Sequence, residues 1–236
     1  MRLSDRLEAI VSLLTPGVCL GDVGTDHALV PVAAIERRIM REAIATDRYQ
    51  APLEQACARL KGRRPAGLRF RQGEGLLPLV EAACDALVIA GMGGRAIVGI
   101  LSAAPRALCS CEQLIVAPNQ EPWLIRQWAL QNGWHLSREM VVYEGGRDYP
   151  ILRLLPVSGA DPAYAAGCAD REWMCHIGPL LLTERSPDIR AYFERQLHRA
   201  KRRSGPDGMR EYEIWRRALD GEWVVPVEEA KEYLNV

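Results

Sequence analysis

The stretch Leu20-Gly21-Asp22-Val23-Gly24-Thr25-Asp26-His27-Ala28-Leu29-Val30-Pro31 decides how the rest of the chain is interpreted. An apolar run ends in a turn that contains glycine and aspartate, and an apolar segment that can form a helix follows it. Strand, glycine turn and helix in that order predict a nucleotide-type site at the carboxyl edge of a parallel sheet. Glycine suits such a turn because it has no Cβ that would obstruct an approaching ligand.

The composition indicates a globular chain of 236 residues, enough for one sizeable domain and a smaller appendage. Its 30 Lys and Arg residues balance 30 Asp and Glu residues, so only a local basic face is left to attract nucleic acid. The seven cysteines include no Cys-x-x-Cys pair, and we expect free thiols and no metal site. No apolar run approaches the roughly 18–20 residues of a membrane helix. Because the first residues are also too charged for a signal peptide, we expect a cytoplasmic protein.

Apolar runs alternate with helical patterns over the first two thirds of the chain. We expect strands at 18–23, 42–46, 68–71, 85–90 and 113–116, and a final pair at 135–143 and 149–155. The expected helices are 3–14, with Ser4 as its cap, then 28–38, 52–60, 96–101 and 123–131. This alternation predicts an α/β fold with a doubly wound, mostly parallel sheet and an antiparallel edge. Seven-stranded methyltransferases have this layout, and periodicity alone equally allows a dehydrogenase.

The pattern changes after Pro156, and we expect one domain at 1–157 and a helical domain at 158–236. Small residues at 158–162 resemble a linker. Two apolar stripes at helical spacing then predict an antiparallel helix pair joined by the turn 204–208. The stripes are Ile189, Tyr192, Phe193 and Leu197, and then Met209, Tyr212, Trp215 and Leu219.

Each expected parallel strand ends in a glycine or a polar residue, and these ends meet at one edge of the sheet. The set consists of Asp22, Gly24 and Asp26 after the first strand, Asp47 after the second, Glu74 after the third, Gly91, Met92 and Gly93 after the fourth, and Asn119 after the fifth. One such feature alone is weak, but a feature at every strand end indicates a ligand site.

Asp47 fits the carboxylate that binds both ribose hydroxyls of a nucleoside, about 20 residues beyond the first glycine turn. Its alternative role is to cap the following helix. The Gly-x-Gly-x-x-Gly fingerprint is absent from the first turn, which disfavours a pyrophosphate and therefore NAD. A ribose-bearing ligand without phosphate fits better, and S-adenosylmethionine is the obvious one.

The other strand-end residues each have a functional and a structural interpretation. Glu74 either binds the amine of the ligand's adenine or is an exposed turn acid. Asp26 either lies beside the sulfonium or target base or caps a helix, and His27 is either a pocket residue or a structural histidine. The glycines at 91–94 either bend under a pocket or only open a helix. Asn119 either matches one edge of an adenine or caps a helix.

The chain resembles the TrmK family, bacterial tRNA adenine-22 N1-methyltransferases, over essentially its whole length. The resemblance is carried by residues 3–7, by Gly24-Thr25-Asp26-His27-Ala28 with Pro31, by Ile89-Ala90-Gly91-Met92-Gly93-Gly94 and by Ala117-Pro118-Asn119. It implies a Rossmann-like class I methyltransferase domain with a coiled-coil-like helical C-terminal domain. It also implies S-adenosylmethionine as donor and tRNA as partner, with direct in-line transfer of the methyl group to adenine N1.

The resemblance also implies roles for particular residues. Asp22, Gly24, Asp26, His27, Asp47, Glu74, Gly91, Met92 and Gly93 belong to the cofactor site, and Asp26 and Asn119 are the expected catalytic residues. Two positions depart from the family pattern. Ala117 stands where the family usually has Gln, which puts one amide contact in doubt, and Glu74 stands where Asp is common.

The arginine-rich face of the C-terminal helices is either a solvated surface or an RNA contact. Its residues are Arg195, Arg199, Lys201, Arg202 and Arg203. We expect Trp123, Trp128 and Trp134 to be core residues, and we expect a monomer. Three other functions remain open: a methyltransferase with another substrate, a non-catalytic RNA-binding relative, and a dinucleotide-dependent reductase.

Overall fold

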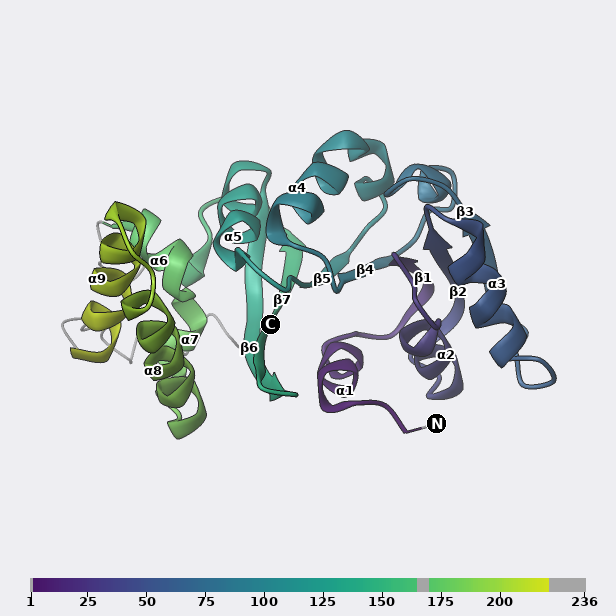
Figure 1. The fold of residues 1–236 in the computed structure, drawn as a ribbon. Coiled ribbons are helices and arrows are strands. Elements are labelled where there is room, and N and C mark those ends of the chain that lie inside the picture. The colour runs from purple at the N-terminus through teal and green to yellow at the C-terminus, as the bar shows by residue number, and fades with distance from the viewer. Residues whose placement is uncertain (1, 165–169, 221–236) are drawn as a thin grey trace.

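The computed structural model describes residues 2–164 and 170–220 and contains one seven-stranded sheet in the order β3-β2-β1-β4-β5-β7-β6 (Figure 1). The first five strands are parallel, and β7 and β6 add an antiparallel edge, as the sequence predicts. The strands are β1 (Gly17–Val23), β2 (Met40–Asp47), β3 (Leu68–Gln72), β4 (Ala86–Ala90), β5 (Gln113–Ala117), β6 (Trp134–Glu144) and β7 (Arg147–Pro156). The strand order places the expected ligand edge where β1 and β4 diverge.

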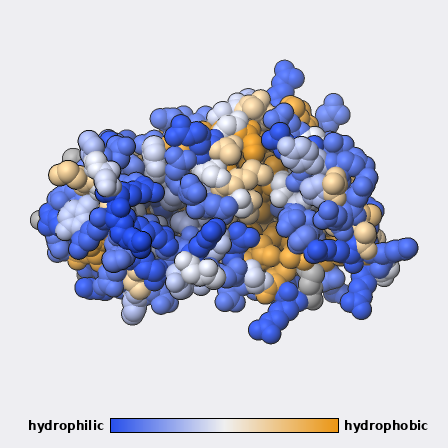
Figure 2. All heavy atoms as spheres, viewed as in Figure 1, coloured by the Kyte–Doolittle hydropathy of each residue, from blue (hydrophilic) through white to orange (hydrophobic). Residues whose placement is uncertain are grey.

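Helices cover both faces of the sheet (Figure 1). One layer contains α1 (Asp5–Ser12), α2 (Leu29–Glu36) and α3 (Gln50–Arg59), and the other contains α4 (Gly94–Ala103) and α5 (Pro122–Gln131). Short 3₁₀ turns lie at Leu77–Leu79, Pro105–Leu108 and Pro162–Tyr164. Figure 2, in the same view, shows apolar side chains gathered between α4 and α1.

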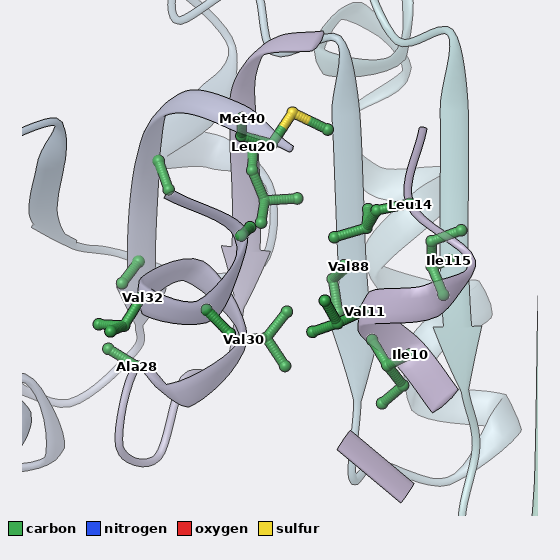
Figure 3. Packing of buried hydrophobic residues seen from close by; sticks show 14 of the residues in the cluster. Ile10, Val11, Leu14, Leu20, Ala28, Val30, Val32, Met40, Val88 and Ile115 are labelled. Atoms are coloured by element: carbon green, nitrogen blue, oxygen red, sulfur yellow. The ribbon is translucent and has the colours of Figure 1, made fainter. Parts of the chain in front are cut away.

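Helix α1 packs against the sheet through its buried apolar residues. Ile10 and Val11 are buried in one cluster with Val88 of β4 and Ile115 of β5, and Figure 3 shows Val11 beside Val88. Ser4 is the N-cap residue of α1, as expected, but its side chain makes no capping hydrogen bond. The predicted cap interaction is therefore wrong, and burial of the apolar face accounts for this helix.

Four helices gather beside β6: α6 (Arg171–Ile177), α7 (Pro179–Glu184), α8 (Pro187–Lys201) and α9 (Pro206–Asp220) (Figure 1). The pair α8 and α9 confirms the predicted hairpin. The second stripe is wrong at Met209, which is 75% exposed at the start of α9. Within residues 2–164 and 170–220, no helix combines the length and apolar character needed to cross a membrane. The remainder of the expected helical domain, 165–169 and 221–236, lies outside the described residues.

Candidate active site at the carboxyl edge of the sheet

A cleft of about 670 Å³ opens at the carboxyl ends of β1, β2, β3 and β4. This volume is within the range of small-molecule sites. Four residues expected in the cofactor site line it, namely Gly24, Asp47, Glu74 and Met92. Asp22, Asp26, His27, Gly91, Gly93 and Asn119 lie outside this lining.

The backbone conformation of Gly24 favours glycine, and the tip of the Met92 side chain lies against it. Its φ is +74°, and a Cβ added to it would overlap the terminal methyl carbon of Met92. The backbone N–H groups of Gly24 and Thr25 both donate to the carbonyl oxygen of Thr46, each at 2.9 Å. The end of β2 therefore fixes the turn after β1, and Met92 lies across the cleft against that turn.

Asp22 lies behind this turn and is only 7% exposed. Its carboxylate has a hydrogen bond with the Thr25 side chain, which favours the charged form, but burial has the larger effect and raises its pKa to about 6. Thr25 Oγ1 in turn accepts a hydrogen bond from the backbone N–H of Ala28 at 3.2 Å. Sequence reasoning did not single out Thr25, although it joins the buried acid to the start of α2.

Asp26 and His27 form a pair at the edge of the turn. His27 Nε2 lies 3.2 Å from a carboxylate oxygen of Asp26, whose side chain is 81% exposed. His27 Nδ1 is buried and has no hydrogen-bond partner among the described residues. The structural alternative for Asp26 is wrong, because Ala28 is the N-cap residue of α2 and Thr25 supplies the local hydrogen bond.

Asp47 stabilises the turn that follows β2 while it lines the cleft. Its Oδ1 accepts a hydrogen bond from the backbone N–H of Tyr49 at 2.8 Å, and Tyr49 is the N-cap residue of α3. Asp47 is therefore a turn acid rather than the cap that the structural alternative required. The carbonyl oxygen of Asp47 accepts from the N–H of Gly73 at 3.0 Å, which holds the loop with the exposed Glu74 beside it.

Asn119 closes the β4 loop rather than capping a helix. Its Nδ2 donates to the Gly91 carbonyl oxygen at 2.6 Å, and its backbone N–H donates to the Met92 carbonyl oxygen at 2.8 Å. The N-cap residue of α5 is Glu121, at φ +54°. Gly93 pairs with Gln120 as an isolated bridge, so the loops after β4 and β5 form one unit.

Ala117, which stands where the family usually has Gln, lies inside the sheet. Ala117 is 1% exposed, pairs with Ala90 on β4 and accepts the N–H of Gly91 at its carbonyl oxygen. In this backbone, its side chain is enclosed by the core beneath α1 and α2. The alanine therefore removes no amide from the described lining of the cleft.

Two exposed side chains in the cleft were missed by sequence reasoning. Tyr49 is 59% exposed and Leu77 is 63% exposed, and both line the cleft together with Met92 and Ile100. Exposed apolar side chains that gather in a ligand-sized cleft, rather than singly on the surface, are typical of a binding site. No sequence signal distinguishes Leu77 from a core leucine, because its exposure depends on the loop between β3 and β4.

Several cations on the expected RNA face have partners within the protein. Arg195 and Arg199 contact the buried carboxylate of Asp148, at 2.6 and 3.0 Å. Arg203 pairs with Glu211 at 2.5 Å, and Lys201 lies over the ring of Tyr212. Within the described part of the chain, Arg202 makes no ion pair.

Trp128 and Trp134 are core residues as predicted, whereas Trp123 is half-buried and stacks on His176.

A methyltransferase-domain family matches residues 3–152. The Bacillus subtilis tRNA (adenine(22)-N(1))-methyltransferase is 30% identical over 79% of this chain and 77% of its own length. The chain belongs to the TrmK family.

Solved structures agree with this family assignment. A Streptococcus pneumoniae protein described as a candidate tRNA (m1A22) methyltransferase was solved in complex with S-adenosyl-L-methionine. It is 26% identical and superposes with a TM-score of 0.82 over 92% of this chain and all of that one. The Bacillus subtilis m1A22 tRNA methyltransferase TrmK is 25% identical, with a TM-score of 0.78 over 99% of both chains. The Rossmann-like methyltransferase fold with a helical C-terminal region is therefore shown, as the resemblance implies.

Proposed function

We propose that this chain transfers a methyl group from S-adenosylmethionine to N1 of adenine 22 in the D-arm region of tRNA. The observation that carries the proposal is that Asp47 and Glu74 line one cleft together with apolar residues and the glycine turn after β1, in a chain of the TrmK family. An acid at the end of β2 suits a ribose, and the turn has no fingerprint for a pyrophosphate.

The residues of the cleft fit this donor. Asp47 binds the ribose hydroxyls and Glu74 the adenine amine, while Leu77 and Met92 supply the apolar surface that an adenine ring requires. Gly24 keeps the β1 turn clear of a Cβ. Asp22 and His27 support the turn from behind and beside it, and Gly91 and Gly93 shape the facing loop. When bound, the donor supplies an electrophilic sulfonium methyl.

The acceptor nitrogen needs no strong base, because adenine N1 carries a lone pair that attacks the methyl group in line. The protein aligns the two reacting atoms and excludes water, which is the orientation effect. Because N1 lies on the pairing edge, the base must be unpaired or flipped, at a cost of a few kcal/mol. Asn119 uses its amide N–H on Gly91, which leaves the amide oxygen to accept from the exocyclic amine of the base. Asp26, exposed at the edge of the turn, stabilises the cationic product.

Transfer of label from S-adenosylmethionine tests the proposal against its alternatives. Purified protein is incubated with unmodified tRNA and, separately, with total protein and small metabolites. We expect label in tRNA alone. Label in protein or in a small molecule would support a methyltransferase of another class, and tight donor binding without transfer would support a non-catalytic relative.

We further infer a cytoplasmic monomer with two domains, 1–157 and 158–236. The described cysteines are all free, which suits a reducing compartment where tRNA is modified. Within the described chain, no cluster of three or more His, Cys, Asp or Glu side chains is arranged to hold a metal ion. The C-terminal helices contact the RNA through Arg202 and Lys201 together with the outward edges of Arg195, Arg199 and Arg203.

A further inference from the structure

A fully buried ion pair lies between α5 and β6, away from the cleft. The side chains of Arg126 and Glu139 are both 0% exposed, and Arg126 Nε donates to Glu139 Oε1 at 2.6 Å. Burying two charges costs several kcal/mol per ion unless further hydrogen bonds compensate. The other contacts of Arg126 therefore indicate what this pair does in the fold.

Arg126 also caps the C-terminal end of one helix in the C-terminal bundle. Its Nη1 donates to the carbonyl oxygens of Cys175 and His176, at 2.6 and 3.3 Å, in the last turn of α6. The last carbonyls of a helix lack partners within it and are stabilised by a cation. One side chain of the methyltransferase domain thus satisfies the end of a helix that belongs to the C-terminal bundle.

The chain beyond α6 fits closely against the same pair. Gly178 has φ +102°, and a Cβ there would lie 2.7 Å from Glu139 Oε2 and 2.9 Å from Arg126 Nη2. A second contact lies nearby, because the rings of Trp123 on α5 and His176 on α6 stack at 4.8 Å. Helices α5 and α6 are therefore neighbours that are joined by more than one side-chain contact (Figure 1).

Helix α5 joins this interface to the loop that carries Asn119. The helix begins at Pro122, and the residues just before it are fixed to the β4 loop by the Gly93–Gln120 bridge and by the N–H of Gly94 bonded to the Gln120 carbonyl at 2.8 Å. A Cβ at Gly94 would overlap the backbone carbonyl of Glu121. The site loop and the C-terminal helices are thus both attached to the first two turns of α5.

We propose that Arg126 is a positioning residue that, with Glu139 and Gly178, holds the C-terminal helices in fixed register with the Asn119 loop. The inference rests on the proposed function, since it assigns the helices the task of holding tRNA while the loop holds the target base. A fixed register places the base within reach of the methyl group, and a displacement of about 1 Å can reduce the rate by about a hundredfold. Arg126 acts through the interface and does not touch the substrate.

The test replaces the pair rather than breaking it, because a lone buried charge would strongly destabilise the fold. Arg126→Met with Glu139→Leu keeps the volume similar and leaves no lone buried charge, but it removes the donor to the carbonyl oxygens of Cys175 and His176. We expect the double variant to fold and to bind S-adenosylmethionine as the wild type does, while kcat for tRNA methylation falls about tenfold or more. Unchanged kcat in a folded double variant would overturn the proposal, and so would a loss of donor affinity equal to the loss of kcat.

A second variant covers the case in which the double variant does not fold. Trp123→Leu removes the stack on His176 at a half-buried position and should also lower kcat with unchanged donor affinity. Hydrogen exchange gives a readout that does not depend on activity. In either variant, the amides of residues 176–178 should exchange faster while those of β1 and β4 do not. If these amides exchange faster but the wild type does not methylate tRNA, the proposed function is wrong while the role of Arg126 in holding the C-terminal helices is supported. Unchanged exchange in the variants would contradict that role of Arg126.

Discussion

Gly24 is constrained by its backbone conformation and by its neighbour. At φ +74°, a residue with a Cβ is strained by roughly 1–2 kcal/mol relative to glycine, and this strain lowers the stability of the fold. A methyl group would also force the tip of Met92, which lines the cleft, to shift. We therefore expect Gly24→Ala to lower the free energy of unfolding by about 1–2 kcal/mol or more in urea titrations and to weaken binding of S-adenosylmethionine in calorimetry.

The two effects at Gly24 can be separated in a Met92→Ala background. There the steric overlap is gone, but the backbone strain remains. Adding Gly24→Ala should then cost less stability than it does in the wild type. An equal cost in both backgrounds would show that Met92 does not restrict this turn.

Asp22 gives a stability effect whose size depends on pH. Burial raises its pKa from the ordinary 3.8 to about 6, so the folded state binds the proton more tightly than the unfolded chain. Its contribution to stability is present below about pH 4 and is lost as the pH rises through about 6. Asp22→Asn should therefore be more stable than the wild type at pH 7.5, by at most about 3 kcal/mol, with the difference vanishing near pH 4. Melting temperatures across this range test the sign, and a variant that is less stable at pH 7.5 would contradict it.

Asp47 has a structural task and a proposed functional one, and one substitution can separate them. Asn retains the oxygen that accepts the Tyr49 N–H but lacks the negative charge. We expect Asp47→Asn to keep the melting temperature and to bind S-adenosylmethionine about ten- to a hundredfold more weakly, since charged hydrogen bonds are the stronger ones. Glu54→Gln, an exposed acid on α3, is the matched control and should leave donor affinity unchanged. Unaltered affinity in Asp47→Asn would exclude the ribose role.

Sequence reasoning located the strand-end residues because alternation alone brings the ends of parallel strands to one edge. It found Gly24, Asp47 and Met92 in this way, and the cleft contains all three. It did not find Tyr49 or Leu77, because only the tertiary structure exposes them. The pattern also could not show that Ala117 points into the core.

Helix α8 is attached to the sheet by one buried acid. Asp148 of β7 accepts hydrogen bonds from Arg195 and Gln196 and pairs with Arg199, and its side chain is 1% exposed. Arg195 also lies over the ring of Tyr143 at 4.3 Å. These contacts give the basic face of α8 a structural task in addition to any contact with RNA.

Arg202 and Arg195 should therefore respond differently to substitution. Arg202→Ala should leave the melting temperature unchanged, weaken tRNA binding and reduce the salt slope of binding by about 1, if Arg202 contacts a phosphate. Arg195→Ala should lower the melting temperature because it removes one partner of a buried carboxylate. Fluorescence anisotropy at several salt concentrations measures the slopes. Identical slopes for Arg202→Ala and the wild type would remove Arg202 from the interface.

Element prediction succeeded for the strands and for the long helices, and it failed for the shortest α-helices. The parallel strands and the α8–α9 hairpin follow directly from the pattern. Helices α6 and α7 have only seven and six residues, too few for a helical stripe to be recognised. Their positions depend on Arg126 and on the third apolar cluster, which includes Trp173 and Phe193.

At the scale of the whole molecule, the described residues form three apolar clusters, and each stabilises a different part of the fold. Two lie on the two faces of the sheet and hold the strand ends that form the cleft. The third holds the C-terminal helices beside β6, where they extend the surface available to a large substrate (Figure 1). The formal net charge is zero, so recognition of tRNA depends on the placement of cations rather than on their total.

The position of the methyl group on tRNA tests the central claim most directly. Unmodified tRNA is incubated with the protein and S-adenosylmethionine, and the product is mapped by reverse transcription and by mass spectrometry of nuclease fragments. Because a methyl group on N1 blocks the pairing edge, the account predicts a reverse-transcription stop at adenine 22 and N1-methyladenosine in that fragment alone. A matched tRNA with guanine at position 22 should remain unmodified. A methyl group at another nucleotide or another atom, or equal labelling of the guanine-22 tRNA, would contradict the account.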